Sequence, residues 1–445
     1  MPAERVLVVG TTADYIDWIR VHHPQRALFL TDARHRASAA APAPHPAEEL
    51  LVDLERPAPA HRAALRDHLA AWPARLSGIA CFDCESLLLA AHLARGLRLP
   101  YHAPEAVAAA RNKLRSKELW HAAGVPCPAA ARIVDEDQAV AFLGRHRPAV
   151  LKPLSGSGSE LIFLCRDAGE CRAAFRTIAS RIRASRNARM YARDSAGADG
   201  PDPREVFLME AFVAGPEYSS DFLLEESGAR LIRVAGKVMD TGGSLGTALA
   251  YALPAALPPP LDEASLLADF AAAARALGIS RGLVMVDFIV RDGRPCLLEM
   301  TPRPGGDCLP PLIRRSSGLD MLGLALDVAA GWPPRIPAPD AWRPLAGARL
   351  IARREGTLAE IDDRLLRDDP RVLECHWTAR PGHAVRLPPA DYDSRILGHV
   401  IFAPSGGDLA RECRELLEPV RVEIRAQPED PGPARACECP REVER

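Results

Sequence analysis

The stretch from residue 283 to residue 303 reads Leu-Val-Met-Val-Asp-Phe-Ile-Val (283–290), Arg-Asp-Gly-Arg (291–294) and Pro-Cys-Leu-Leu-Glu-Met-Thr-Pro-Arg (295–303). Two apolar runs around an Asp-Gly pair are typical of a β-hairpin, which would place Asp287 beside Glu299. Neighbouring carboxylates repel each other unless a cation lies between them, and Mg²⁺ prefers such oxygen ligands. Both acids interrupt strongly apolar strands, which disfavours a merely solvated pair. The stretch therefore predicts a hairpin with a metal site.

Lysine is rare in this chain. Only four of its 56 lysine and arginine residues are lysines: Lys113, Lys117, Lys152 and Lys237. A compact ammonium fits among phosphate oxygens as a point charge, where a guanidinium demands planar geometry. Lys152 precedes Ser155-Gly-Ser-Gly-Ser159, whose small residues let backbone N–H groups approach an anion. An ordinary hairpin turn is the alternative for this loop, but together the two features indicate a phosphate site. It is not a Walker loop, because the lysine precedes the glycines.

The chain divides into three parts and a tail. Residues 1–103 hold short apolar runs separated by helical stretches, which is typical of parallel strands with crossover helices. The first turn, Gly10-Thr-Thr, lacks the dinucleotide-binding fingerprint. Residues 104–335 mix helices with antiparallel strands, and a single helix is expected over 106–123. Strands in 344–426 predict a small closing domain, and the composition of 427–445 predicts a disordered tail.

Composition excludes several classes of protein. The net charge of −2 gives no basic field for nucleic acid, and no apolar run reaches the ~20 residues of a membrane span. The start of the sequence shows no signal-peptide pattern, and the 11 scattered cysteines are typical of reduced thiols. We therefore expect a cytoplasmic protein without nucleic-acid or membrane partners. The Cys81-Phe-Asp-Cys84 pair is expected to be structural, since no second pair lies at zinc spacing.

From Pro104 to Trp332 the sequence resembles the ATP-grasp ligases, and the whole chain resembles their carboxylate–amine ligase branch, which includes L-amino acid ligases and biotin carboxylase. The order and spacing of several motifs carry this resemblance. They are Asn112-Lys113, Lys152 with the loop 155–159, Met209-Glu210-Ala-Phe-Val213, Glu217, and Asp287 followed twelve residues later by Glu299-Met-Thr301-Pro-Arg303.

The resemblance implies a fold of mixed α/β and α+β class. A Rossmann-like α/β domain (1–103) would precede an ATP-grasp domain (104–335) with antiparallel sheets, a lid subdomain at about 125–212 and a large subdomain at about 213–335. It also implies ATP with Mg²⁺, or Mn²⁺, as cofactors. The implied ATP-binding residues are Lys113, Lys152, Ser155, Gly156, Ser157, Gly158, Glu210, Phe212, Val213 and Glu217.

The same resemblance assigns Asp287, Glu299 and Thr301 to the metal, and Arg303 and Lys237 to catalysis. Thr301 stands where the family usually has asparagine, which shortens the reach of that ligand. Tyr251 lies near the usual position of an acceptor-site histidine. Lys117, one helical turn from Lys113, is expected to face solvent.

The implied activity is ATP-dependent joining of a small-molecule carboxylate, expected to be an amino acid, to an amine. An acyl phosphate would form first, and ADP and phosphate would be released. Three alternatives stay open: a carboxylase, a purine-pathway ligase, and a regulatory module that binds ATP without catalysis. Monomer and homodimer both remain open as the oligomeric state.

Overall fold

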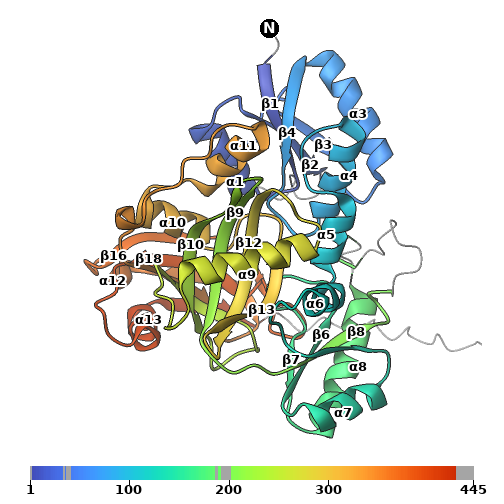
Figure 1. The fold of residues 1–445 in the computed structure, drawn as a ribbon. Coiled ribbons are helices and arrows are strands. Elements are labelled where there is room, and N and C mark those ends of the chain that lie inside the picture. The colour runs from blue at the N-terminus through green and yellow to red at the C-terminus, as the bar shows by residue number, and fades with distance from the viewer. Residues whose placement is uncertain (1–2, 34–35, 37–41, 186–188, 192–201, 427–445) are drawn as a thin grey trace, which may run out of the picture.

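The computed structural model describes residues 3–33, 36, 42–185, 189–191 and 202–426. The predicted tail, 427–445, lies outside these residues. The mixed α/β and α+β class expected from the sequence is confirmed, with three bodies built around separate sheets and a fourth small sheet at the C-terminal end (Figure 1).

The N-terminal body is a four-stranded parallel sheet in the order β3-β2-β1-β4. Its strands are nearly continuous apolar runs because helices cover them, so Leu7, Val9, Leu28 and Leu30 are almost fully buried. The elements are β1 (Ala3–Val9), α1 (Ala13–His22), β2 (Ala27–Asp32), β3 (Glu49–Val52), α3 (Ala58–Ala71), β4 (Ala74–Ala80) and α4 (Leu87–Leu97).

Two short helices connect this body to the rest, where the sequence predicted one helix over 106–123. The structure has α5 (Pro104–Arg111) and α6 (Lys113–Ala122). Asn112 between them leaves helical geometry (φ −89°, ψ 101°), and its side chain accepts a hydrogen bond from the Arg115 N–H at 3.1 Å. An Asn N-cap explains the break, because it offers the backbone an alternative to continuing the helix. Lys113 thereby becomes the first residue of α6.

A small antiparallel sheet in the order β5-β8-β6-β7 forms the lower part of the molecule in Figure 1. Its strands are β5 (Ala130–Ile133), β6 (Ala149–Pro153), β7 (Phe163–Cys165) and β8 (Phe207–Ala211). The helices α7 (Glu136–Arg145) and α8 (Ala168–Ala184) cover it. Leu151, Met209, Phe142 and Ile178 form the interface between sheet and helices. The opposite face of this sheet lines the candidate site described below.

The central body is an eight-stranded antiparallel sheet in the order β13-β12-β9-β10-β11-β14-β18-β16. Three of these strands come from the C-terminal part of the chain, so the part expected as a closing domain shares a sheet with the central part. The strands are β9 (Glu217–Glu225), β10 (Gly228–Met239), β11 (Ala248–Leu253), β12 (Gly282–Arg291), β13 (Arg294–Thr301), β14 (Leu345–Ile351), β16 (Val372–Trp377) and β18 (Ile396–Phe402).

The helix α9 (Glu263–Ala276) covers part of one face of this sheet (Figure 1). Between helix and strands, the ring of Phe270 contacts those of Phe222 and Phe288. At the C-terminal end lies a three-stranded sheet of β15 (Gly356–Asp362), β17 (Ala384–Val385) and β19 (Arg421–Arg425). The remaining elements are η1 (Pro339–Ala341), α12 (Arg364–Arg367) and α13 (Leu409–Leu417). Within the described ranges, no helix combines the length and apolarity that a membrane crossing requires.

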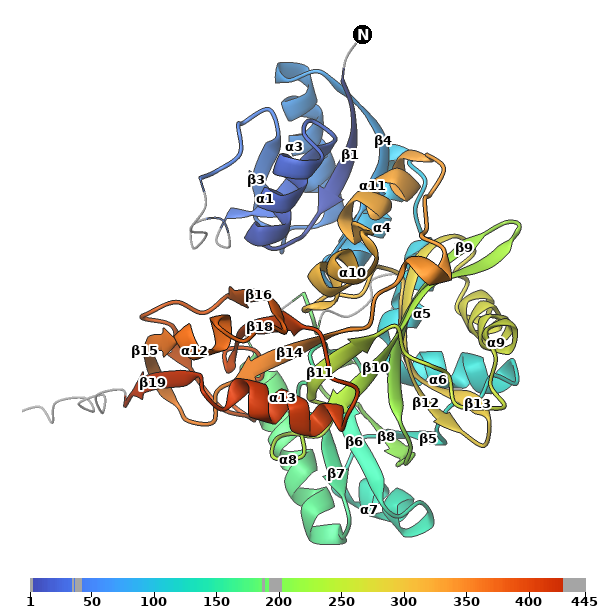
Figure 2. The same cartoon turned by 90° about the vertical axis from the view of Figure 1, so that its left-hand side faces the viewer.

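The helices α10 (Leu309–Ser317) and α11 (Met321–Ala330) return the chain to the N-terminal body, and α11 packs on β4 (Figure 2). Asp320 fixes this junction. One carboxylate oxygen caps α11 by accepting from the N–H groups of Leu322 (3.0 Å) and Gly323 (3.2 Å). The other accepts from Trp18 Nε1 at 2.7 Å and lies 2.8 Å from His23 Nε2. Burial by itself would raise the pKa of Asp320, but these hydrogen bonds lower it to about 2.

Candidate active site

The hairpin of β12 and β13 places two carboxylates side by side, as predicted. Asp287 and Glu299 are direct cross-strand partners. One oxygen of Asp287 lies 2.9 Å from Lys237 Nζ, whereas the other, Oδ1, is buried without a hydrogen-bond partner among the described residues. A buried orphan carboxylate oxygen is costly, and a divalent cation would satisfy it. The pair therefore fits Mg²⁺.

Thr301 is the third residue that the sequence assigned to the metal. It ends β13, is 5% exposed and lines the same cavity as Asp287 and Glu299. In the described part of the chain, no group of three His, Cys, Asp or Glu side chains has the arrangement to hold a metal ion. A cation at the carboxylate pair would thus complete its shell with hydroxyl or backbone oxygens, water and phosphate oxygens, as Mg²⁺ commonly does.

Lys113 links the loop 155–159 to this pair. Its backbone N–H donates to the Leu154 carbonyl at 2.8 Å, and its Nζ donates to the Gly156 carbonyl at 3.0 Å. The same Nζ lies 3.4 Å from Glu299 Oε1. Because Lys113 opens α6, its ammonium projects from a fixed helix end between loop and carboxylate.

Lys152 on β6 meets Glu210 on the neighbouring strand β8. Its Nζ lies 2.7 Å from Glu210 Oε2, and Lys117 Nζ lies 3.4 Å from the other oxygen, Oε1. Burial alone would raise the pKa of the Glu210 carboxyl, but the Lys117 and Lys152 ammonium groups hold it below its ordinary value. Glu210 is therefore a carboxylate between two lysines.

The prediction that Lys117 faces solvent was wrong. The side chain is 2% exposed, and it donates to the Leu298 carbonyl on β13. Its Nζ also lies 4.8 Å from the centre of the Trp120 ring, which is fully buried. The helix α6 packs on α5, β5 and α9, and the Lys117 side chain reaches β8 and β13, so the helix has less free surface than its polar sequence suggested. Burial lowers the pKa of the Lys117 ammonium.

Lys237 on β10 lies between two acids. Its Nζ is 2.7 Å from Glu217 Oε1 and 2.9 Å from Asp287 Oδ2. Burial alone would lower the pKa of Lys237, but Asp287 and then Glu217 hold it well above its ordinary value, so the side chain is a cation. Tyr251 of β11 is its direct cross-strand neighbour. The structure thus brings Lys237 to the carboxylate pair.

Two glycine-rich segments meet over the site. Ser159 Oγ donates to the Gly246 carbonyl at 2.7 Å, which joins the loop 155–159 to the segment 241–246. Gly158 adopts φ +62°, and a Cβ there would lie 2.9 Å from Asp393 Oδ1. The loop is therefore closely surrounded and conformationally restricted at Gly158, whereas Gly156 has open space around it.

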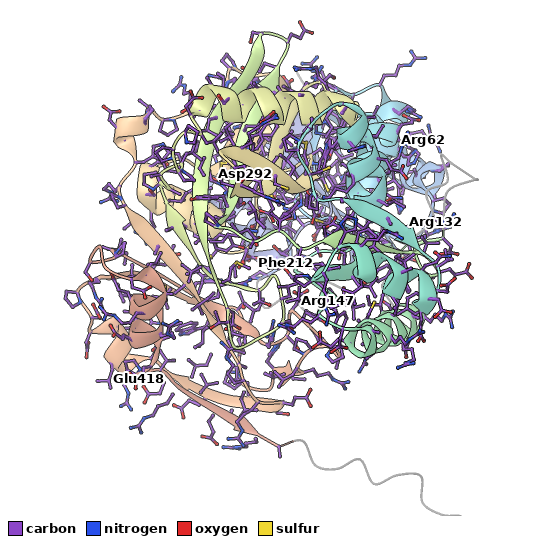
Figure 3. The ribbon with its side chains drawn as sticks, turned by 60° about the horizontal axis from the view of Figure 1, so that its bottom comes forward. Arg62, Arg132, Arg147, Phe212, Asp292 and Glu418 are labelled. Carbon is purple, nitrogen blue, oxygen red and sulfur yellow. The ribbon has the colours of Figure 1, made fainter. Side chains whose placement is uncertain are left out.

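Two overlapping cavities run along these residues. The first has a volume of about 800 Å³ and lies against the segment 210–217; we call it the hinge cavity. Val213 and Glu217 are among its lining residues. Phe212, labelled in Figure 3, lines it and is 37% exposed. The flap cavity, of about 380 Å³, is lined by the loop residues Ser155 to Ser159, by Thr301 and by Arg303. Both cavities share Lys113, Lys152, Lys237, Asp287 and Glu299. The predicted nucleotide and metal residues therefore line one continuous cleft.

Arg303 stands where the cleft meets a third space. Its Nη1 donates to the Pro304 carbonyl at 2.7 Å, and its Nη2 lies 3.0 Å from Cys84 Sγ. The segment that follows Arg303 is bound to strand β9, because the Gly305 N–H donates a hydrogen bond to Asp221 at 2.8 Å. Asp221 in turn pairs with the fully buried Arg233 at 2.7 Å.

The third space, the α10 cavity, measures about 620 Å³ and lies between α1, α10 and β18. Most of its polar residues belong to no motif in the sequence and were not predicted. His399 on β18 is 9% exposed, and its Nε2 has no hydrogen-bond partner among the described residues. Burial, and then His376, lower the pKa of His399 to about 4, so the ring is neutral near pH 7. Asp307, held by Arg349 at 2.7 Å, lines the junction with the flap cavity. One sequence signal was available, namely a polar residue within an otherwise apolar strand. The same signal marked Asp287, and it is present at Arg349 and His399.

Comparison with known proteins identifies the family of the chain. Residues 145–311 match the family model of the ATP-grasp domain. The D-alanine–D-alanine ligase of Aromatoleum aromaticum is 31% identical over 243 residues, which cover 52% of this chain and 70% of that ligase. The L-amino acid ligase from Bacillus licheniformis has the same fold, with a TM-score of 0.76 at 18% identity over 95% of this chain and 99% of that chain. The chain belongs to the ATP-grasp ligase family.

Two other relatives match this chain over only part of their own length. The uncharacterized protein y4rH of Sinorhizobium fredii is 30% identical over 319 residues, which cover 70% of this chain and 61% of that protein. Human carnosine synthase 1 is 30% identical over 295 residues, covering 62% of this chain and 33% of the synthase. The chain thus spans about a third to three fifths of these relatives. Members of the family are ATP-dependent C–N ligases that act on small molecules.

Proposed function

We propose that this chain is an ATP-dependent ligase that joins the carboxylate of an amino acid to an amine through an acyl phosphate, releasing ADP and phosphate. The observation that carries the proposal is the position of Arg303. It lines the flap cavity together with the carboxylate pair and the loop 155–159, and it also lines the α10 cavity. A carboxylate held by Arg303 would therefore lie between the phosphate end of the nucleotide cleft and a separate space for the second substrate.

In this proposal the hinge cavity takes the adenosine of ATP. The backbone of 210–213 would bind the base, and Glu217 would bind the ribose. Lys113, Lys152 and the N–H groups of 155–158 would surround the phosphates. Asp287, Glu299 and Thr301 would hold Mg²⁺ or Mn²⁺, which when bound offsets negative charge on the phosphates and orients them.

An amino acid fits the donor position better than a simple carboxylic acid. Asp393 lines both the flap cavity and the α10 cavity, as Arg303 does. Burial, then Asp391 and Glu85, raise the pKa of Asp393, so an added cation would be favourable there. The ammonium of an amino acid whose carboxylate binds Arg303 would supply that cation.

Two displacements then account for the chemistry. An oxygen of the donor carboxylate attacks the γ-phosphorus of ATP, and the bond to the bridging oxygen breaks to release ADP. The amine nitrogen next attacks the acyl carbon and loses a proton, and the C–O bond to phosphate breaks. No side-chain nucleophile is required, because positioning and charge stabilisation by Lys113, Lys237 and Arg303 suffice for such steps. The segments 155–159 and 241–246 would exclude the water that hydrolyses acyl phosphates.

An oxygen-18 experiment tests the proposal. The protein is incubated with ATP, MgCl₂, a set of ¹⁸O-carboxyl amino acids as donors, and hydroxylamine as a small amine trap. The proposal expects ADP, hydroxamate and phosphate in equal amounts, with one ¹⁸O atom in each phosphate. ADP released with unlabelled phosphate would contradict the acyl phosphate. ATP binding without ADP release with any donor would favour the regulatory module, an alternative suggested by threonine at position 301.

A further inference from the structure

A row of four residues crosses one face of the central sheet. Thr301 on β13 is the direct partner of Met285 on β12. Met285 is also the partner of Asp221 on β9, and Asp221 is the partner of Arg233 on β10. Directly paired residues point to the same face of a sheet. Because Thr301 and Met285 both line the flap cavity, the charged end of the row lies on the face that carries the candidate site.

The segment 303–307 crosses this row and covers its charged end. The chain leaves β13 at Thr301, and four residues later the Gly305 N–H donates to Asp221 Oδ1 at 2.8 Å. Two strand spacings amount to about 10 Å, a distance that four residues of chain can span. A Cβ on Gly305 would lie 2.5 Å from Arg233 Nη2, so the backbone lies directly on the guanidinium. This cover explains why both charged side chains are fully buried.

Stability alone does not account for the buried ion pair. Arg233 Nε donates to Asp221 Oδ2 at 2.7 Å, but Arg233 Nη1 and Nη2 are buried without a hydrogen-bond partner among the described residues. Unpartnered buried N–H groups are costly, and apolar side chains of similar size often give equal or greater stability than a buried ion pair. Apolar side chains cannot, however, accept a hydrogen bond from the Gly305 N–H. The carboxylate therefore fixes the point at which the segment 303–307 crosses the sheet.

We infer that Asp221 is a positioning residue for Arg303. Asp221 lines neither the flap cavity nor the α10 cavity, so it acts through the segment and not on a substrate. Arg303 lies midway between Thr301 and Gly305, and its own N–H donates to the Thr301 carbonyl at 2.8 Å. Both ends of this short stretch are thus held, and Asp221 sets where the guanidinium meets the donor carboxylate. This inference rests on the proposed function and names the residue that positions its donor-binding group.

Two variants separate positioning from stability. Arg233→Met keeps the Asp221 acceptor but leaves a buried carboxylate without its cation, so the free energy of unfolding should fall while the donor KM stays close to that of the wild type. The combination of Asp221→Leu with Arg233→Met removes the charges and the acceptor together. It should unfold in urea like the wild type, yet raise the donor KM roughly ten- to hundred-fold with an unchanged KM for ATP, because a hydrogen bond to a charged group is lost.

The donor KM is measured as ADP release, with hydroxylamine as the amine and the best donor of the oxygen-18 experiment. The matched control is the combination of Asp269→Leu with Arg294→Met, which removes an ion pair at the surface between α9 and β13. It should change neither KM. A wild-type donor KM in the folded Asp221/Arg233 double variant would overturn the inference, as would an equal rise in the KM for ATP. A donor KM raised equally by Arg233→Met alone would also overturn it, as would a double variant that does not fold.

Hydrogen exchange tests the same inference without activity. The amides of 303–307 should exchange faster in the Asp221/Arg233 double variant than in the wild type, because the Gly305 N–H has lost its acceptor. Equal exchange would show that Asp221 does not hold the segment and would overturn the inference. A wild-type protein that releases no ADP with any donor would instead overturn the proposed function, and the exchange result would still decide whether Asp221 fixes the position of the segment.

Discussion

The substitution Glu299→Gln tests the carboxylate pair with a small change of shape. Glutamine has the size of glutamate but removes one negative charge from the position opposite Asp287. The structure predicts two separable effects, because Glu299 faces the cleft and is only loosely bound to the rest of the protein. Its one ion pair in the described structure is with Lys113, at 3.4 Å.

The expected loss of activity is large, whereas the loss of stability is small. One unit charge about 4 Å from a cation contributes about 4 kcal/mol at an effective dielectric constant of ~20, and a doubly charged cation doubles that upper bound. Glu299 is 30% exposed, so water reduces this contribution. We expect a roughly hundred- to thousand-fold decrease in ADP formation. The pair with Lys113 should cost under about 1 kcal/mol of folding free energy when broken.

The assay measures donor-dependent ADP release over a range of Mg²⁺ concentrations, with urea unfolding of the same preparations. Glu225→Gln is the matched control, because Glu225 lies at the far end of β9 in an exposed pair with Arg230. It should retain wild-type activity. If Glu299→Gln unfolds like the wild type and still releases ADP at more than about a tenth of the wild-type rate, the assignment of Glu299 to the metal is refuted.

Four further predictions concern other parts of the molecule. Lys117→Met removes a cation beside Glu210 and a hydrogen-bond donor to the Leu298 carbonyl. It should lower the free energy of unfolding by about 1–3 kcal/mol. An unchanged urea midpoint would contradict the buried contacts of Lys117. Arg303→Lys should reduce donor-dependent ADP formation at least about tenfold, because an ammonium cannot replace two parallel hydrogen bonds; wild-type kinetics would exclude a donor-binding role. Backbone amides of 155–159 should exchange more slowly with ATP and Mg²⁺ present, and equal exchange would count against a closing flap. The pKa of Asp320, about 2, lies below the ~3.9 of an unfolded aspartate, so its stabilisation is present above about pH 4 and disappears as the pH falls toward 2. Asp320→Asn should therefore be less stable than the wild type by about 2 kcal/mol at pH 7, and the two should converge near pH 2; a constant difference would show that the charge is not responsible.

Local patterns predicted the elements of the central body well. The hairpin from 282 to 301 and the pairing of Asp287 with Glu299 followed from an Asp-Gly turn between two apolar runs, because turn and alternation fix the register of a short hairpin. The break at Asn112 was missed, although asparagine is itself a favoured N-cap residue. The helical pattern continued on both sides of it and concealed the cap.

Contacts between residues far apart in the sequence determine features that no motif could predict. Lys117 and Lys113 are one helical turn apart, and the sequence could not show that Glu210 on β8 and the Leu298 carbonyl on β13 lie within reach of Lys117. Arg314 and Trp18 are separated by 296 positions, and only the return of α10 to the N-terminal body brings them together.

The sequence by itself determined the class of the protein and the residues that we predict to bind the nucleotide, because these depend on patterns within one hairpin, one loop or one helix end. Only the tertiary structure revealed the α10 cavity, where we propose that the second substrate binds. The α10 cavity is built from α1, α10 and β18, three elements from distant parts of the chain. Contacts between such elements depend on how complete surfaces pack, and no short pattern in the sequence records that.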